Sequence, residues 1–190
     1  MTKSGRPFAR ERKIDAVDVI DILFEVIDMR SFSNLWYWIA LAVLWSSTSH
    51  WVLGIPHDMI HRARREGGQA EVDLEDLARI NTNRLLHVVD RGLYAVIGMA
   101  AFWLTFLGVL GFYYDVEFAQ AIFLLMAPMS VVVWRSVLVS RRIAGGDNQG
   151  EALYGQLIWH RRVTQSIGML AVTLTALYGT WQNINSSALN

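Results

Sequence analysis

The chain contains no cysteine. This absence excludes disulfides, thiolate metal sites and cysteine catalysis. The formal net charge is zero, and no nucleic-acid partner is expected. The first 13 residues are polar and basic with no apolar stretch directly behind them, so no cleavable signal peptide is expected. No Ser-His-Asp set, Walker loop or dinucleotide fingerprint occurs, so no motif names a reaction.

Two long uncharged runs stand out from the rest of the sequence. Gly92 to Tyr114 is 23 residues without a charge, and Phe118 to Trp134 adds 17 more. A bilayer core about 30 Å thick needs roughly 20 apolar residues in a helix. Lipid does not tolerate unpaired backbone groups, so both runs must be helical. Joined by the short link 113–117, they predict an antiparallel hairpin in an all-α integral membrane protein.

We expect four apolar helices in a membrane domain over 34–190, after a polar N-terminal part over 1–33. The expected spans are 35–55, 92–114, 118–139 and 163–181. The first is the weakest, because a polar stretch from Ser46 to His50 interrupts it, and a re-entrant segment is the alternative. Amphipathic interfacial helices are expected in the loop 57–91, where 57–66 stops at Gly67-Gly68 and 69–91 continues into the second span near Gly92. A second loop covers 140–162.

The placement of charge predicts the orientation. All 17 basic residues fall into the blocks 3–30, 57–91 and 135–162, with six, six and five in turn. Because basic residues concentrate in cytoplasmic loops, 57–91 and 135–162 are predicted to be cytoplasmic, with the 113–117 turn and the C-terminus outside. If the first segment spans, the N-terminus also lies outside, which we favour. If it re-enters, the N-terminus lies inside.

Residues 14–29 form a predicted amphipathic helix with an acidic face that includes Asp18, Asp21 and Glu25. The segment is too short and too charged to span a bilayer. One interpretation is a docking surface for a partner. The other is a solvated face on a helix that lies along the membrane. Cationic faces suit anionic lipid, so an acidic face leans toward protein contact.

His57 and His61 are candidate metal ligands. Histidines at i and i+4 share a helix face, a common half of a zinc or iron site. Asp58 stands where the catalytic glutamate of a His-Glu-x-x-His motif would be, so that motif is absent. The alternative is a pair of interfacial polar residues. The groups that would complete a metal site are His87, Glu71, Asp73 and Glu75.

His50 is the one histidine inside an apolar run. An ionisable group at membrane depth is a functional hypothesis, here a ligand for haem or a chlorophyll-type pigment such as bacteriochlorophyll, or a proton relay. The alternative is a neutral histidine hydrogen-bonded to Ser46, Ser47 or a neighbouring carbonyl. We expect this polar stretch to face a helix–helix interface. No cofactor is the leading expectation.

Three stretches carry a family resemblance: Ile27 to Trp38, Ser49 to Gly54, and Arg62 to Gly68. Together they resemble a group of small bacterial membrane proteins, some of which are labelled "component of SufBCD complex". The resemblance covers most of the chain and implies a bacterial inner-membrane protein with a non-enzymatic role. Iron–sulfur scaffolding does not fit a chain without cysteine.

The leading hypothesis is a non-catalytic accessory or scaffold subunit of a bacterial inner-membrane complex. Its expected partners are the lipid bilayer and other membrane subunits, including copies of itself. One alternative is a haem- or pigment-associated subunit of an electron-transfer or photosynthetic complex, using His50 with His57 or His61. Another is a small oligomeric ion channel lined by Ser46 to His50, although the spans lack pore-lining carboxylates.

Overall fold

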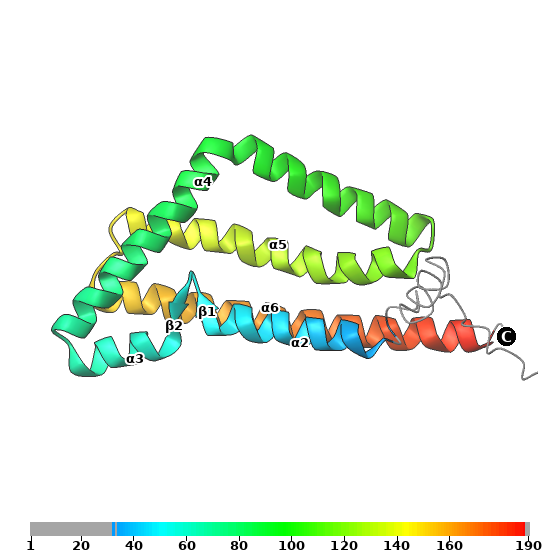
Figure 1. Cartoon of the computed structure of the whole chain (residues 1–190), viewed down its shortest axis with the longest axis horizontal. Helices are drawn as coiled ribbons and strands as arrows, with labels where there is room; N and C mark the ends of the chain where they lie inside the picture. Colours follow the sequence, from blue (N-terminus) through cyan, green and yellow to red (C-terminus); the bar gives the residue numbers. More distant parts are fainter. Residues whose placement is uncertain (1–31, 33, 189–190) are drawn as a thin grey trace, which may run out of the picture.

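The computed structural model describes residue 32 and residues 34–188. Within these residues the chain is helical apart from one short β-hairpin, so the predicted all-α class is confirmed (Figure 1). In chain order the elements are α2 (Leu35–His50), β1 (Trp51–Val52), β2 (Ile55–Pro56), α3 (His57–Glu66), α4 (Gln69–Gly108), the π-helical turn η2 (Val109–Tyr113), α5 (Glu117–Ala144) and α6 (Gly150–Ala188).

Residues with positive φ set the turns around α3. Leu53 (φ 52°) and Gly54 (φ 70°) form the tight turn between β1 and β2. A two-residue hairpin turn of this kind requires positive φ at both central positions. Gly67 (φ 62°) and Gly68 (φ 56°) then separate α3 from α4. Glycine adopts this region without a steric penalty, and the predicted helix end at this pair is confirmed.

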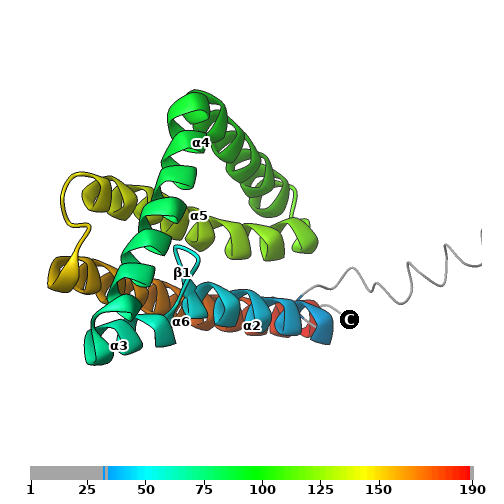
Figure 2. The same ribbon diagram turned by 60° about the vertical axis from the view of Figure 1, so that its left-hand side comes forward.

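Helix α4 bends at Gly92, whose backbone is not helical (φ −126°, ψ 21°). Residues 69–91 cross one end of the other long helices, and the apolar half then runs back beside α5 (Figures 1 and 2). The predicted passage from a charged helix into an apolar one near Gly92 is therefore present, with a sharp change of direction. We call residues 93–108 together with η2 the apolar arm.

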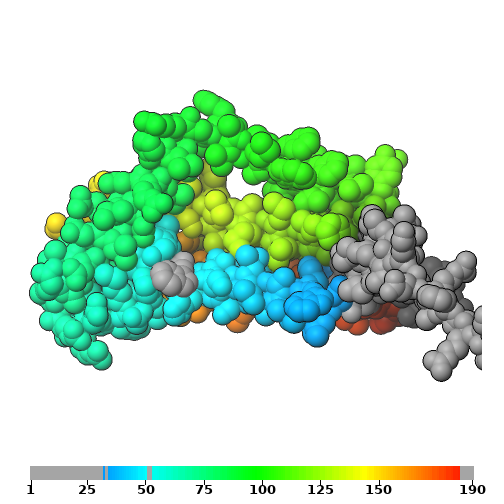
Figure 3. Space-filling model, in the orientation of Figure 1, coloured from blue at the N-terminus to red at the C-terminus, as the bar shows by residue number. Residues whose placement is uncertain are grey.

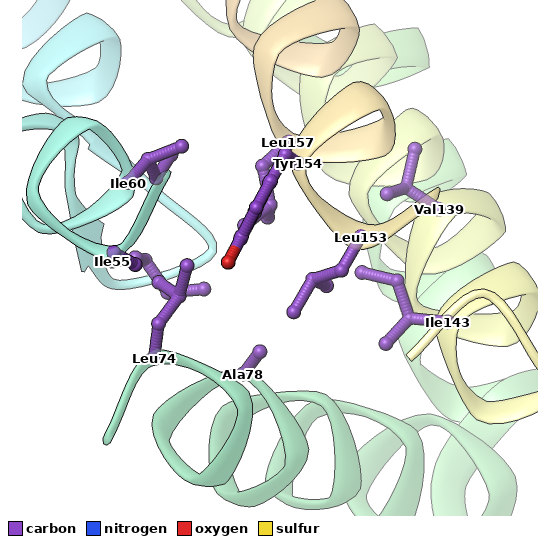
Figure 4. Close-up of a cluster of buried hydrophobic side chains, with 10 residues drawn as sticks. Ile55, Ile60, Leu74, Ala78, Val139, Ile143, Leu153, Tyr154 and Leu157 are labelled. Carbon is purple, nitrogen blue, oxygen red and sulfur yellow. The ribbon is translucent and has the colours of Figure 1, made fainter. Parts of the chain in front are cut away.

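The charged blocks pack together around one core at the end of the molecule where the arm begins. We call this unit the head: α3, residues 69–91 of α4, 137–144 of α5 and 150–160 of α6. Leu74, Leu153 and Leu157 are completely buried there, and Figure 4 shows side chains from all four helices converging. The cluster consists of Ile55, Ile60, Ala63, Leu74, Ala78, Val139, Ile143, Leu153, Tyr154 and Leu157.

Polar contacts fix the start of α6 within the head. The Gly150 backbone N–H donates to Glu75 Oε1 at 3.0 Å. Arg64 Nε donates to Glu151 Oε1 at 3.1 Å on the surface. A carboxylate is favourable at a helix N-terminus, where the backbone N–H groups have no helical partner. The exposed ion pair adds only about 0–1 kcal/mol, so the apolar cluster is the main source of stability in the head.

Helix α2 lies along α6, and two glycines of α6 make this close approach possible. A Cβ at Gly168 would lie 2.7 Å from the Trp45 ring, and one at Gly179 would lie 3.1 Å from Phe32. At that far end the Phe32 N–H also donates to Glu117 Oε1 at 2.8 Å. Helix α2 thus extends from the end where α5 begins to the hairpin beside the head, and it does not turn back as a re-entrant segment would.

Two predicted boundaries are wrong. An apolar helix was expected over 35–55, but α2 ends at His50 and the residues that follow form the β-hairpin. The expected loop 140–162 is almost entirely helical, because α5 runs to Ala144 and α6 starts at Gly150. The end of an apolar run was taken as the end of a helix, although arginines such as Arg141 and Arg142 are good helix formers.

Among the described residues, two helices are long and apolar enough to cross a membrane: 69–113 and 117–144. They contain the predicted spans 92–114 and 118–139 almost completely. Helix α2 has 16 residues, fewer than the roughly 20 that a bilayer requires. Helix α6 is long enough, but its apolar part contains several threonines and a glutamine. The expected spans 35–55 and 163–181 therefore stay predictions.

Candidate functional site

A layer of buried polar side chains lies between α5 and α6 where the head meets the apolar halves of the helices. His160 is only 2% exposed. Its Nε2 lies 3.0 Å from Ser136 Oγ, and that hydroxyl donates to the Val132 carbonyl at 2.9 Å. Because the single hydroxyl proton is used in that bond, the contact to histidine requires the Nε2 proton to be donated to Ser136. Neutral His160 then presents Nδ1 as an acceptor.

Several polar atoms of this layer have no hydrogen-bond partner among the described residues. They are His160 Nδ1, Arg135 Nε, Ser140 Oγ and Thr164 Oγ1. Leaving a buried polar group unsatisfied costs about 1–3 kcal/mol. Such groups in a native fold usually mark bound water or another ligand. Bound water would satisfy these atoms.

The layer does not assemble a nucleophile in the part of the chain that the structure describes. A catalytic serine needs its hydroxyl proton to be accepted by histidine, whereas Ser136 donates to its own helix. In addition, His160 Nδ1 has no hydrogen-bond partner among the described residues, and so no carboxylate orients the ring. The Ser136–His160 contact is thus a structural hydrogen bond between two helices.

Burial, and then the positive charge of Arg135, lower the pKa of His160 to about 4. In the unfolded chain the histidine pKa is about 6.5. Between these values the unfolded chain binds a proton that the folded chain does not. We therefore expect stability to be complete above about pH 6.5 and to fall toward pH 4, by at most about 1.4 kcal/mol per pH unit from this group.

Thermal unfolding in detergent at several pH values tests this. His160→Gln should reduce the loss of stability on acidification relative to the wild-type protein. His87→Gln is the matched control, because His87 is exposed on α4. Equal pH dependence in all three proteins would contradict a buried, neutral His160.

The predicted pair His57 and His61 does come together. Their Nε2 atoms lie 2.9 Å apart and their rings meet edge to face. Burial, Arg161, His61 and His50 lower the pKa of His57, so one neutral ring accepts a hydrogen bond from the other. His50 is thus close enough to act electrostatically on His57, as the alternative that grouped these histidines requires.

The surroundings of the pair do not favour a cation. Arg161 is close enough to affect His57, and the described residues contain no group of three or more His, Asp or Glu side chains able to hold a metal ion. Two of the four expected additional ligands are engaged elsewhere: Asp73 accepts from Gln69 Nε2 at 2.7 Å, and Glu75 accepts from Gly150. A metal at His57 and His61 stays a prediction without further support.

The polar stretch of α2 lies at the edge of its contact with α6. Ser46, Ser47 and His50 are exposed. Ser46 and Ser49 line an open hollow of about 740 Å³ between these helices, together with Gln165 of α6. The contact that holds α2 in place is Trp45 on Gly168. A haem or pigment ligand role for His50, and a pore-lining role for the serines, stay predictions.

The predicted acidic docking residues Asp18, Asp21 and Glu25 lie outside the described residues. The sequence interpretation missed His160 and Ser136, which are 24 residues apart.

Compared with known proteins, the chain matches no family model, no curated protein and no solved structure. The function must therefore be inferred from this geometry alone.

Proposed function

We propose that the protein is a non-catalytic accessory or scaffold subunit of a bacterial inner-membrane complex. The observation that carries this proposal is the apolar arm of α4. Only 6% of the most apolar 18-residue window of this helix is buried within the chain. The apolar helix of a soluble core would be mostly buried, so the arm needs lipid or another protein to cover it.

The distribution of side chains on α6 supports a lipid environment. In its second half, small or polar residues such as Gly168, Thr175 and Gly179 face inward. Large apolar residues face outward: Met169, Leu170, Leu174, Leu177 and Trp181 are all at least 55% exposed. Small residues inside and large apolar residues outside are typical of helix packing in membranes. We therefore treat α6 as a further span beside α4 and α5, while α2, which lies along α6, has only 16 residues.

The charge pattern gives the orientation of this proposal. The head contains most of the basic blocks 57–91 and 135–162, and so it lies in the cytoplasm. Asp115, in the turn after the arm, then lies outside. Single cysteines report this directly, because the chain has none of its own. An impermeant thiol reagent applied to intact cells should label a cysteine at Asp115 and should not label one at Gly146.

The surface proposed for a partner helix is on the outer side of the arm. Gly98, Ala101 and Thr105 line an open hollow of about 580 Å³ there, beside Phe102 and Phe106. The two phenylalanine rings stack, with centroids 6.1 Å apart. A Cβ added at Gly98 would meet nothing within 4 Å. Small residues beside aromatic ones allow a second helix to approach closely.

Co-purification in mild detergent, followed by mass spectrometry, tests the scaffold proposal. The wild-type chain should retain a specific membrane-protein partner. Ala101→Leu should fill the hollow and reduce the retained partner about tenfold, the effect of about 1.4 kcal/mol.

Ala95→Leu is the matched control, since Ala95 is an exposed alanine of the arm that does not line the hollow. It should leave the partner bound. If the two variants behave alike, or if the wild-type chain retains no partner, this surface is not a docking site.

A further inference from the structure

The apolar arm and α5 enclose a crevice that opens to the side of the molecule. The helices touch near their turn, where the Phe112 and Phe123 ring centroids are 5.4 Å apart. They touch again at the head, where Val89 and Val137 are buried. Between these contacts they separate, and Figure 3 shows the opening. The cavity has a volume of about 290 Å³.

The walls of this crevice are almost entirely apolar. They are formed by aliphatic side chains, methionines and Trp134, with Leu93 and Ala100 on the arm. Ser130 is the one hydroxyl in the wall, and it donates to the Ala127 carbonyl at 2.6 Å. Apolar cavities of this kind stay dry or bind apolar molecules. A void there would also lose the dispersion contacts of its lining.

A second hollow, of about 480 Å³, adjoins the crevice on its head side. Val133 lines both cavities. Most of this hollow is apolar, but Arg84, Asn81 and Ser136 bring polar groups to its wall. Within the part of the chain that the structure describes, Arg84 is in no ion pair, whereas the neighbouring Arg79 pairs with Asp76 at 2.8 Å.

We propose that an anionic phospholipid binds here, with one acyl chain in the crevice and its phosphate group on Arg84. An unpaired guanidinium next to a dry slot is complementary to a molecule with an anionic head and a hydrocarbon tail. Guanidinium binds phosphate oxygens through two parallel hydrogen bonds. A partner helix, which is about 10 Å in diameter, does not fit in a cavity of about 290 Å³ that is closed at both ends by packed side chains. This proposal rests on the proposed membrane location and is independent of the protein partner.

The binding site lies at the depth that such a lipid requires. Arg84 is eight residues before the bend at Gly92, on the cytoplasmic side in the proposed orientation. The crevice continues from there along the uncharged arm. The phosphate group would therefore lie at the cytoplasmic boundary of the bilayer, and the acyl chain would point to its centre. The lipid would act as a wedge that keeps the arm apart from α5 and in position for a partner.

Native mass spectrometry of the purified full chain tests the proposal. The protein is incubated with equal amounts of phosphatidylglycerol and phosphatidylcholine that have the same acyl chains. We expect the anionic lipid to be retained preferentially. Arg84→Gln should lower the ratio of bound anionic to zwitterionic lipid about fivefold, the effect of losing one basic residue near an anionic lipid. Arg79→Gln, on the same helix, should leave the ratio unchanged.

A second variant tests whether the acyl chain of the lipid occupies the crevice. Ala100→Phe places a ring in the crevice and should reduce retention of both lipids by similar factors. Equal retention of the two lipids by the wild-type chain would overturn the proposal, as would equal effects of Arg84→Gln and Arg79→Gln. A lipid-free dimer would also overturn it, because a second copy would then fill the crevice. If Ala100→Phe does not fold, the comparison of Arg84→Gln with Arg79→Gln still tests the proposal. The experiment uses the purified chain without a protein partner, so its outcome does not depend on the co-purification test.

Discussion

Leu153→Ala should destabilise the head by about 2–5 kcal/mol, the usual cost of truncating a fully buried leucine. Leu153 is completely buried. It lies in the cluster that α3, α4, α5 and α6 form together. Relaxation is restricted there, because four helices would have to move to close the cavity. A domain is typically stable by only about 5–15 kcal/mol, so the head should open measurably more often.

Limited proteolysis with trypsin in mild detergent measures this opening. Arginine side chains of the head such as Arg64, Arg65 and Arg79 are already exposed, but trypsin cleaves only where the helical backbone has unfolded. Leu170→Ala is the matched control: the same substitution in the same helix, at a side chain that is 64% exposed. We expect faster cleavage of Leu153→Ala and an unchanged rate for Leu170→Ala. Equal rates would show that the cluster does not hold the charged blocks together.

Long apolar runs were the most informative feature of the sequence. The run from Gly92 to Tyr114 predicted a helix, and the structure has the arm and its π-helical turn there. Physical constraints explain this success, because a run as long as a bilayer is thick permits almost no other structure. The end of α3 before Gly67 and Gly68 was also predictable from the sequence, since two adjacent glycines readily adopt positive φ.

Because the prediction relied on hydrophobicity, it did not show that α6 is one continuous helix from Gly150 to Ala188. Its buried face continues from the head into the second half of the helix with unbroken spacing of three and four residues. That face changes from leucine to small and polar residues on the way, so an apolar pattern is not visible in it. The available signal was a contrast in size, with small or polar residues on the inward face and large apolar ones on the outward face. The buried positions are Leu153, Leu157, His160, Thr164, Gly168, Ala171, Thr175 and Gly179.

The buried polar layer illustrates what a single sequence does not contain. Ser136 and His160 meet only because α5 and α6 pack as antiparallel neighbours in one register. His160 was placed outside the last span as part of a loop, which left it without an expected role. Its position on the buried face of α6 was the available signal. The bend at Gly92 is similar: the sequence indicated a boundary there, but the crevice beside α5 follows from the angle of the bend.

Gly111→Ala should weaken the contact between the arm and α5 by about 1–3 kcal/mol, the usual cost of overpacking a close contact. A Cβ at Gly111 would lie 2.9 Å from the backbone nitrogen of Gln120 and 3.1 Å from its Cα. Backbone atoms of a helix have little freedom to move aside. The buried Gln120 side chain also donates to the Gly111 carbonyl and to Asp115 Oδ1, both at 2.9 Å. Displacing the arm would therefore break hydrogen bonds as well as packing.

Gly98→Ala is the matched control for this substitution. Both glycines belong to the arm, but a Cβ at Gly98 would meet nothing within 4 Å. Alanine is a better helix former than glycine by about 0.5–1 kcal/mol, so Gly98→Ala should be neutral or slightly stabilising. In thermal unfolding in detergent, followed by circular dichroism, the unfolding temperature should thus fall for Gly111→Ala and should stay unchanged or rise slightly for Gly98→Ala. A loss of stability in both would mean that the arm tolerates no added side chain anywhere. No loss in Gly111→Ala would mean that the arm is not anchored at Gln120, and the crevice beside α5 would then have no fixed width.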